Sequence, residues 1–340
     1  MRIIMVGFGV VGQSFAKILT LRQNEIIKNF GIHPKVVAIA DRYGAIYNPR
    51  GLNLEKISHL KKTKETVAAD PEFGRRNMSA LELIESTEAE IMIEATPTDI
   101  RTGEPGLSHI KTALKTGKHV ITTNKGPLAL ALPALTELAD YNNVYLRFSG
   151  TVGGGAPILD LAKKCLLGDR ILSISGILNG TTNYILTEMD EKSISFQQAL
   201  NNAQKLGYAE ADPSMDVDGI DSACKLVIMA NWLMNKKVTL KDVKIKGIRN
   251  VTSKDLEEAA KKNCALKLIG SINGGLKVAP TEISKRNPLC VSGVLNAVTF
   301  VSQFAGEETI IGRGAGGMET ASAMLRDLIE IKQSLSIKSI

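Results

Sequence analysis

The stretch RIIMVGFGVVG, residues 2–12, joins a short apolar run to three glycines spaced as G-x-G-x-x-G. The run predicts a buried strand at 2–6, and the residues that follow predict a helix at 10–28. In such a turn the first glycine permits the tight bend, the second admits a pyrophosphate, and the third lets helix and strand pack. The helix N-terminus then attracts the anion. A glycine turn without nucleotide is the alternative. The predicted dinucleotide site comprises Gly7, Phe8, Gly9, Val10, Val11 and Gly12.

The alternation of strand and helix patterns continues through the first 150 residues or so. Further strands are predicted at 35–40, 89–94, 118–122 and 143–148, with helices at 79–87, 107–116 and 127–141. This order is typical of a doubly wound parallel sheet of the Rossmann type. We therefore predict an α/β protein in which residues 1–148 form a dinucleotide-binding domain.

The pattern changes at SGTVGGGAP, residues 149–157, where four glycines and a proline predict a domain junction. Beyond it we predict helices at 157–167, 195–206 and 219–235, a strand at 170–178, a hairpin at 266–283 turning at Asn273-Gly274-Gly275, a strand pair at 298–312 and a closing helix at 318–335. These elements predict a second α/β domain with a largely antiparallel sheet at 149–312. A C-terminal segment, 313–340, follows it.

Length and composition narrow the class of protein. A chain of 340 residues is long enough for two domains. The net charge of +7 comes from dispersed lysines, and aromatic residues make up 4%, which argues against a nucleic-acid partner. The apolar opening is too short and too rich in glycine for a signal peptide or a membrane span. The four cysteines are far apart without a CxxC, which argues against zinc and disulfides and favours a reducing, cytoplasmic compartment.

The residues after the second predicted strand bear on the cofactor. Asp41 ends that strand, where a carboxylate can accept a hydrogen bond from a ribose 2′-hydroxyl and so favours NAD. Arg42 follows it and can hold a 2′-phosphate, as NADP requires. The lysines at 56–64 lean slightly towards the phosphate. NAD and NADP both stay open.

Two later strand ends carry polar residues. Ligands of open α/β sheets lie beyond the carboxyl ends of strands, so EATPTD is predicted to bring Thr96, Pro97 and Thr98 near a nicotinamide. The stretch ITTNKGP ends its strand at Asn124 and Lys125. A lysine at a strand end is usually solvated, but its place beside a nicotinamide pocket favours contact with the substrate.

A lysine also precedes an apolar run in DVDGIDSACKLVIMAN, residues 216–231. Asp221 and Lys225 are four residues apart, so on a helix they share a face and can form an ion pair. A surface salt bridge is one interpretation. The apolar residues after Lys225 instead indicate a buried helix, where an ammonium needs a partner, and Asp221 is the nearest candidate.

The loop before this helix adds polar side chains at Tyr208, Glu210, Asp212 and Asp216. Solvated loop acids are one interpretation, and a polar pocket for an amino acid is the other. An enzyme that interconverts aldehyde and alcohol by hydride transfer needs a group that supplies a proton to the alkoxide. Lys125 and Lys225 are the natural candidates for that group.

Seven stretches together resemble homoserine dehydrogenase, in the same order and over essentially the whole chain: GFGVVG, EATPTD, TTNKGPL, GTVGGGAP, ILNGTTNYIL, LGYAEADPSMDVDGIDSACK and GRGAGGMETASA. The resemblance implies reversible, NAD(P)-dependent interconversion of L-aspartate 4-semialdehyde and L-homoserine, a step towards threonine, methionine and isoleucine. It also implies a homodimer formed through the second domain.

The resemblance further implies roles for individual residues. Lys125 and Lys225 match the two functional lysines of the family, and Asp221 matches its catalytic aspartate. Substrate-binding positions are matched by Glu210, Asp216, Tyr208, Gly180 and Thr181. The last helix is expected to return to the nucleotide domain, with Gly314 and Gly316 near the cofactor.

Two departures from the family accompany the resemblance. Ser149 stands where many relatives carry a glutamate, just before a turn whose backbone carbonyls hold a monovalent cation. Sodium binding through the carbonyl of Val152 is therefore an open expectation. The chain ends soon after the closing helix, so neither a regulatory domain nor a fused aspartate kinase is expected.

The sequence offers less for two rival functions. An aspartate-semialdehyde dehydrogenase needs a thiolate with a nearby histidine, but neither His109 nor His119 adjoins a cysteine in the sequence. A non-catalytic nucleotide sensor would have no use for the set Lys125, Glu210, Asp221 and Lys225.

Overall fold

The computed structural model describes residues 1–337 and divides into two compact units. The first unit contains Met1–Thr151 and the described residues from Gly316 onward, and the second contains Val152–Ala315. The dinucleotide and substrate roles given to 1–148 and 149–312 stay predictions. Residues 338–340 of the predicted segment 313–340 lie outside the described residues.

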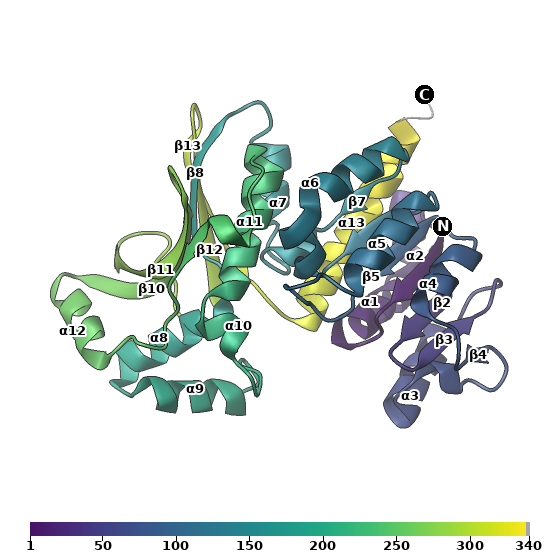
Figure 1. Ribbon diagram of the computed structural model, residues 1–340, viewed down its shortest axis with the longest axis horizontal. Coiled ribbons are helices and arrows are strands. Elements are labelled where there is room, and N and C mark those ends of the chain that lie inside the picture. Colours follow the sequence, from purple (N-terminus) through teal and green to yellow (C-terminus); the bar gives the residue numbers. More distant parts are fainter. Residues whose placement is uncertain (338–340) are drawn as a thin grey trace. The chain divides into compact units, whose positions relative to one another are not determined.

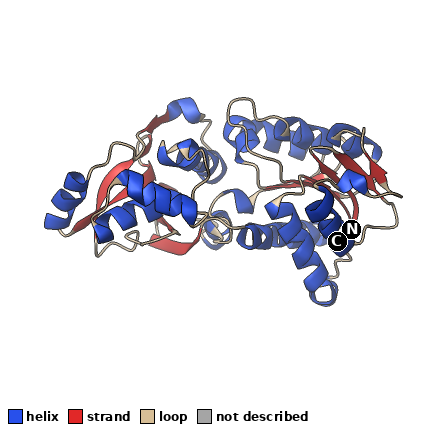
Figure 2. Cartoon of the chain, turned by 90° about the horizontal axis from the view of Figure 1, so that it is seen from below, coloured by secondary structure: helices blue, strands red, loops and turns tan. Residues whose placement is uncertain are grey.

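The first unit is built on a seven-stranded sheet in the order β4-β3-β2-β1-β5-β6-β7. The five strands from β2 to β7 in this order run parallel, and β3 and β4 add an antiparallel edge. Its strands are β1 (Arg2–Val6), β2 (Lys35–Asp41), β3 (Gly44–Tyr47), β4 (Gly74–Arg75), β5 (Ile91–Glu94), β6 (His119–Thr122) and β7 (Leu146–Arg147). Its helices, which lie on both sides of the sheet in Figure 2, are α1 (Val10–Leu21), α2 (Gln23–Phe30), α3 (Leu54–Lys64), α4 (Ala80–Ser86), α5 (Gly106–Lys115), α6 (Lys125–Tyr141) and α13 (Gly317–Ile337).

The predicted parallel sheet of the first unit is confirmed, but two predictions within it were incomplete. The single helix predicted at 10–28 is two helices, because Arg22 leaves the helical conformation (φ −109°, ψ 14°) and pairs with Glu25 in the first turn of α2 at 2.7 Å. The apolar spacing continues across this break and conceals it. Strands β3 and β4 and helix α3 were not predicted, because the segment carries few apolar residues in a regular period.

Helix α13 belongs to the core of the first unit although it is the last helix in the chain (Figure 1). Its buried residues Met324 and Leu328 join Phe15 of α1 and Ile39 of β2 in one apolar cluster. Burial of such side chains contributes roughly 1.5–3 kcal/mol each, so this packing is enough to anchor the returning chain.

The second unit has a six-stranded sheet in the order β13-β12-β8-β10-β11-β9, largely antiparallel as predicted. Its strands are β8 (Ile171–Ile177), β9 (Val243–Ile245), β10 (Cys264–Ile272), β11 (Leu276–Ser284), β12 (Leu295–Ser302) and β13 (Gly306–Arg313). Its helices are α7 (Ile158–Asp160), a π-helical turn (Leu161–Cys165), α8 (Gly180–Lys192), α9 (Phe196–Lys205), α10 (Ser214–Val217), α11 (Ile220–Met234) and α12 (Ser253–Lys261). The hairpin β10–β11 turns at the predicted Asn273-Gly274-Gly275.

Helix α11 is the central helix of the second unit. All residues from Asp221 to Asn231 are buried, and the helix contacts β9, β10 and β11. The apolar run that predicted a buried helix is thus explained by packing on the sheet. Among residues 1–337 no helix is both long enough and apolar enough to cross a membrane.

Candidate functional site

The glycine-rich turn after β1 has the geometry that its spacing predicts. Gly7 has φ +95°, and a Cβ placed there would lie 2.4 Å from the carbonyl oxygen of Ala95. A Cβ on Gly12 would lie 2.4 Å from the carbonyl oxygen of Gly7, so helix and turn are in direct contact. A Cβ on Gly9, by contrast, would meet nothing within 4 Å. Gly9 therefore leaves open space at the N-terminus of α1, which no side chain caps.

The other predicted residues of this turn contribute differently. The Phe8 side chain is buried in the apolar core, so Phe8 can offer a ligand its backbone but not its ring. Val10 is 74% exposed, and Val11 is partly buried. A Cβ on Gly317 would lie 2.7 Å from both Val10 Cγ1 and Ser14 Oγ, so α13 begins against the first turn of α1.

Gly316 directly precedes α13 and has φ +128°. A Cβ on Gly316 would meet the Glu319 carboxylate at 2.1 Å, so this carboxylate folds back over the start of its own helix. A carboxylate there satisfies the positive end of the helix dipole. The position of Gly316 is thus explained within the first unit, and a cofactor contact at Gly316 stays a prediction.

The Asp41 carboxylate accepts hydrogen bonds from four groups of the first unit, which the sequence did not reveal. Oδ2 accepts from Lys61 Nζ and from the backbone N of Val67, both at 2.8 Å. Oδ1 accepts from Thr66 Oγ1 at 3.0 Å and from Tyr43 N at 2.9 Å. A carboxylate has about four acceptor sites, so these contacts fill it.

This hydrogen bonding does not support the prediction that Asp41 accepts from a ribose hydroxyl. The Asp41 side chain is 4% exposed, whereas the next residue, Arg42, is exposed. Asp41 instead ties the end of β2 to Lys61 of α3 and to Thr66 and Val67 in the segment after that helix.

The ends of β5 and β6 are joined by hydrogen bonds. Asn124 Nδ2 donates to Thr96 Oγ1 and to the Pro97 carbonyl oxygen, each at 3.3 Å. Asn124 Oδ1 accepts from Gly126 N at 3.1 Å, so Asn124 caps α6, which begins at the partly buried Lys125. Thr98 is exposed. The structure therefore brings Thr96, Pro97 and Asn124 together, as predicted from the adjacent strand ends, with Lys125 next in the chain.

The acidic loop and the helix after it form a buried polar cluster in the second unit. Lys225 Nζ lies 2.7 Å from Asp221 Oδ2 and donates to the Leu178 carbonyl oxygen at 2.7 Å. Asn179 Nδ2 donates to Asp216 Oδ1 at 2.6 Å and to Asp221 Oδ2 at 2.9 Å. The surface salt bridge is ruled out, because the two charged side chains are 7% and 8% exposed.

Asn179 was missing from the predicted site although it links both aspartates. Its Oδ1 also accepts from Thr182 N at 2.9 Å, so it caps α8. The signal in the sequence was an asparagine directly before Gly180, a typical N-cap position. Burial and the neighbouring Asp221 carboxylate raise the pKa of Asp216, while the Asn179 hydrogen bond opposes them.

The remaining predicted substrate residues lie around this cluster with different exposure. Thr181 Oγ1 donates to the Tyr208 carbonyl oxygen at 2.7 Å, and the exposed Tyr208 ring packs 5.0 Å from the ring of Tyr184. A Cβ on Gly180 would lie 2.7 Å from the Val294 carbonyl oxygen, so only glycine fits there. The exposed Glu210 contributes its carbonyl to Gln204. Thr181 and Tyr208 are thus joined, whereas the Glu210 side chain is exposed.

The glycine-rich turn at 152–156 contains the predicted cation site. Ala156 N donates to the Gly153 carbonyl at 2.8 Å, so that carbonyl is already used within the turn. Ser149 Oγ donates to Asp327 Oδ1 at 2.6 Å, and Ser149 N donates to Asp327 Oδ2 at 3.0 Å. The hydroxyl is thus held inside the first unit, which does not favour a role for Ser149 as a ligand.

Gly314 has a structural reason to be glycine. A Cβ there would lie 2.0 Å from Asn296 Nδ2, and a Cβ on Gly154 would lie 2.8 Å from the Gly314 carbonyl oxygen. The buried Asn296 amide and the turn at 152–156 are therefore both packed closely against Gly314. A cofactor contact at Gly314 stays a prediction.

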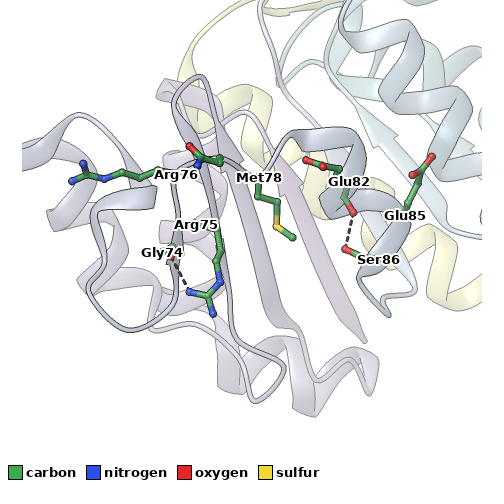
Figure 3. A pocket seen from close by; sticks show the side chains of 8 residues that line it. Gly74, Arg75, Arg76, Met78, Glu82, Glu85 and Ser86 are labelled. Carbon is green, nitrogen blue, oxygen red and sulfur yellow. Dashed lines mark hydrogen bonds between the residues drawn. The ribbon is translucent and has the colours of Figure 1, made fainter.

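A surface hollow of about 770 Å³ lies beside β4 and α4. Figure 3 shows the Arg75 guanidinium turned back towards Gly74, whose carbonyl oxygen accepts from it at 2.9 Å, and Arg76 pointing away from α4. Glu82 closes a capping box with Ser79 at the start of α4. The charged groups here do not converge on one point, so the hollow is not favoured as a reaction site.

Comparison with known proteins identifies the family. The family model for homoserine dehydrogenase matches residues 157–329, and that for Glutamate/Leucine/Phenylalanine/Valine dehydrogenase matches residues 1–104. A homoserine dehydrogenase from Methanocaldococcus jannaschii is 45% identical, with 98% of this chain and 99% of the relative covered. The chain belongs to the homoserine dehydrogenase family. This membership favours a homoserine dehydrogenase over both an aspartate-semialdehyde dehydrogenase and a non-catalytic sensor.

Two further relatives show how far the likeness extends. The NAD(+)-dependent homoserine dehydrogenase of Pseudomonas canavaninivorans is 40% identical, with 99% of this chain and 97% of the relative covered. A hyperthermophilic archaeal homoserine dehydrogenase solved in complex with NADPH superposes with a TM-score of 0.85 at 31% identity, covering 98% of each chain. The chain therefore spans nearly the full length of these homoserine dehydrogenases.

Proposed function

We propose that this chain catalyses the reversible interconversion of L-homoserine and L-aspartate 4-semialdehyde, with NAD or NADP as cofactor. Membership of the homoserine dehydrogenase family supports this reaction, and relatives are described with each of the two cofactors. The buried cluster of Asp216, Asp221 and Lys225 is the observation that carries the proposal. A buried ion pair costs desolvation, so its presence beside an acidic loop favours a chemical role.

Lys225 is proposed to handle the proton of the substrate hydroxyl. A bound NAD(P) would supply the hydride chemistry at the carbinol carbon. The substrate oxygen then has to lose a proton when the alcohol is oxidised and gain one when the aldehyde is reduced. An ammonium has three N–H bonds. Two of those on Lys225 point to Asp221 and to the Leu178 carbonyl, and the third is proposed to face the reacting oxygen. The contacts with Asp221 and the Leu178 carbonyl fix the orientation of the Lys225 amine.

The surrounding residues are proposed to hold the amino-acid part of the substrate. The carboxylates of Asp216 and Glu210 suit its ammonium group, and backbone at Gly180 with the Thr181 and Tyr208 side chains would line the pocket. Asn179 fixes the Asp216 carboxylate at 2.6 Å, which favours one orientation of it towards the substrate.

The first unit is proposed to hold the cofactor. The open space at Gly9 suits a pyrophosphate at the N-terminus of α1, with backbone from 7–12 around it. Arg42 suits the ribose end, next in the chain to Asp41, which binds Lys61 of α3. Thr96, Pro97, Thr98 and Asn124 suit the nicotinamide end. Lys125 is proposed to contact the substrate, and Gly314 and Gly316 to lie near the cofactor.

Three further features are proposed by analogy with the family. The first two are a homodimer formed through the second unit and a cytoplasmic location. A sodium ion on the Val152 carbonyl is proposed as the third. Sodium-dependent activity, compared with potassium at equal ionic strength, tests the ion.

The deciding experiment is an assay of the purified protein with L-homoserine and each cofactor separately. We expect reduction of NAD, NADP or both to require L-homoserine, and D-homoserine serves as the matched control substrate. The ratio of kcat/KM values gives the cofactor preference. Absence of L-homoserine-dependent reduction with both cofactors across a range of pH would refute the proposal.

A further inference from the structure

Glu94, at the end of β5, is a carboxylate with no role in the proposed reaction, although it is completely buried (0% exposed). Burying an ionised carboxylate is unfavourable unless hydrogen bonds satisfy its oxygens. Glu94 Oε1 accepts from both the backbone N (3.1 Å) and the hydroxyl of Thr96, and Oε2 accepts from the Thr122 hydroxyl at 3.1 Å. Glu94 therefore connects the ends of the neighbouring strands β5 and β6.

These contacts close into a ring of hydrogen bonds. The Thr122 hydroxyl accepts from Asn124 N at 3.0 Å, and Asn124 Nδ2 donates to Thr96 Oγ1 at 3.3 Å. The ring thus runs from Glu94 through Thr122 and Asn124 to Thr96 and back to Glu94. A shift of the carboxylate would move both strand ends.

The ring also fixes the start of α6. Asn124 Oδ1 accepts from Gly126 N, so the Asn124 side chain belongs both to the ring and to the N-terminal cap of α6. Lys125 lies between Asn124 and Gly126 in the chain. Gly126 allows the close approach, because a Cβ there would lie 2.1 Å from the Asp99 carbonyl oxygen. The first turn of α6 is therefore tied to Asn124 on one side and to the loop after β5 on the other.

Helix α5 packs closely against the ring of hydrogen bonds. A Cβ on Gly106 would lie 2.5 Å from Asn124 Nδ2 and 3.3 Å from the Glu94 carboxyl carbon. One turn later, the buried His109 places Nδ1 at 3.8 Å from Glu94 Oε1. Within residues 1–337 that nitrogen has no hydrogen-bond partner. This packing restricts the carboxylate to one arrangement.

We propose that Glu94 is a positioning residue for hydride transfer, which holds Thr96, the Asn124 cap and through them Lys125 in the arrangement that the reaction requires. The inference rests on the proposed function, since it takes Thr96 to lie near the nicotinamide and Lys125 to contact the substrate. Glu94 itself touches neither cofactor nor substrate. Its two oxygens accept three hydrogen bonds, of which a glutamine amide could accept only the two from Thr96, because the amide nitrogen would face the Thr122 hydroxyl as a donor.

The test compares Glu94→Gln with a second variant, Thr122→Val, which keeps the shape of the side chain but removes the hydroxyl that links Glu94 to Asn124. Asp70→Asn is the matched control, since it also neutralises a buried carboxylate that accepts backbone N–H bonds, from Glu72 and Phe73. Each protein is assayed with L-homoserine and with L-homoserine deuterated at the carbinol carbon. Cofactor affinity is measured by nicotinamide fluorescence and folding by thermal unfolding.

We expect both variants to lower kcat on the order of tenfold to a hundredfold, since small misplacements of reacting groups have effects of this size. The deuterium isotope effect on kcat should rise because hydride transfer becomes slower relative to the other steps. The cofactor affinity of both variants and the kinetics of Asp70→Asn should stay at wild-type values.

A purely structural role of Glu94 would lower the unfolding temperature and leave kcat and the isotope effect of the folded enzyme unchanged, which would overturn the inference. If Glu94→Gln does not fold, Thr122→Val decides by the same criteria. Failure of the wild-type protein to oxidise L-homoserine would instead refute the proposed function.

Discussion

The ammonium of Lys225 lies 2.7 Å from the carboxylate of Asp221, one helical turn away in α11, with both side chains more than nine-tenths buried. On an exposed helix such a pair contributes about 0.3–0.5 kcal/mol. Inside a protein, removal of one partner leaves the other charge buried and costs about 3–5 kcal/mol. The two side chains therefore depend on each other, because loss of either one would leave the other buried without its partner.

Lys225→Ala should abolish most turnover while cofactor binding persists. Loss of a general acid or base typically costs about 10²–10⁴ in rate. Steady-state kinetics give the loss in kcat, and fluorescence titration with NADPH or NADH gives the cofactor Kd. Lys192→Ala is the matched control, because it removes an ion pair of the same spacing, with Glu188 in α8, whose lysine is 56% exposed. Normal turnover in folded Lys225→Ala would contradict the role proposed for this lysine.

Asn179→Asp should move the acid limb of the pH profile of kcat/KM to higher pH. The pKa of Asp216 is raised by burial and by Asp221, and the Asn179 amide lowers it. Replacing that donor with a carboxylate removes the opposing effect and adds a like charge, so the pKa rises further and the ionised form is lost at higher pH. Asn53→Asp makes the same change at the exposed cap of α3 and is the control. An unshifted acid limb would show that Asp216 ionisation does not govern activity.

Gly9→Ala should fold normally but bind cofactor more weakly. Within residues 1–337 the added methyl group meets no atom of a non-neighbouring residue within 4 Å, so it would occupy the space proposed for the pyrophosphate. We expect Kd to rise by about tenfold or more, equivalent to ~1.4 kcal/mol. Gly275→Ala, which also meets nothing within 4 Å but lies in the β10–β11 turn, should bind as the wild type does. Equal affinities of the two variants would place the nucleotide elsewhere.

Lys267→Met should make the free energy of unfolding increase less steeply with pH in the alkaline range below 10.5. Burial lowers the pKa of Lys267 from its usual 10.5, and its Nζ donates to Asn183 Oδ1 at 2.9 Å and Thr187 Oγ1 at 3.2 Å. Between the lowered pKa and 10.5 the unfolded chain holds a proton that the folded chain has released, so the free energy of unfolding increases with pH there. Urea unfolding at several pH values measures the slope. The exposed Lys277→Met is the control, and an identical slope in Lys267→Met and wild type would refute the assignment.

Local regularities in the sequence predicted much of the fold. The period of two or of 3.6 in apolar residues located most strands and helices, and glycine spacing located the turn at 7–12. Helix α12 and the break at Arg22 were missed because the first has few apolar positions and the second interrupts no apolar spacing. The sequence also predicted the family and its reaction, since the motifs of homoserine dehydrogenases occur in order along the chain.

By itself, the sequence determined the two sheet types, the helical pairing of Asp221 with Lys225 and the glycine turn, because each depends on residues close together in the chain. Tertiary structure decided which side chains meet across long separations. Lys61 and Thr66 reach Asp41, Asn179 reaches Asp216 and Asp221, and Thr122 reaches Glu94. No periodicity encodes such contacts, since they depend on strand order and on helices packing against sheets. Because these polar residues are buried, each depends on the others for its hydrogen bonds.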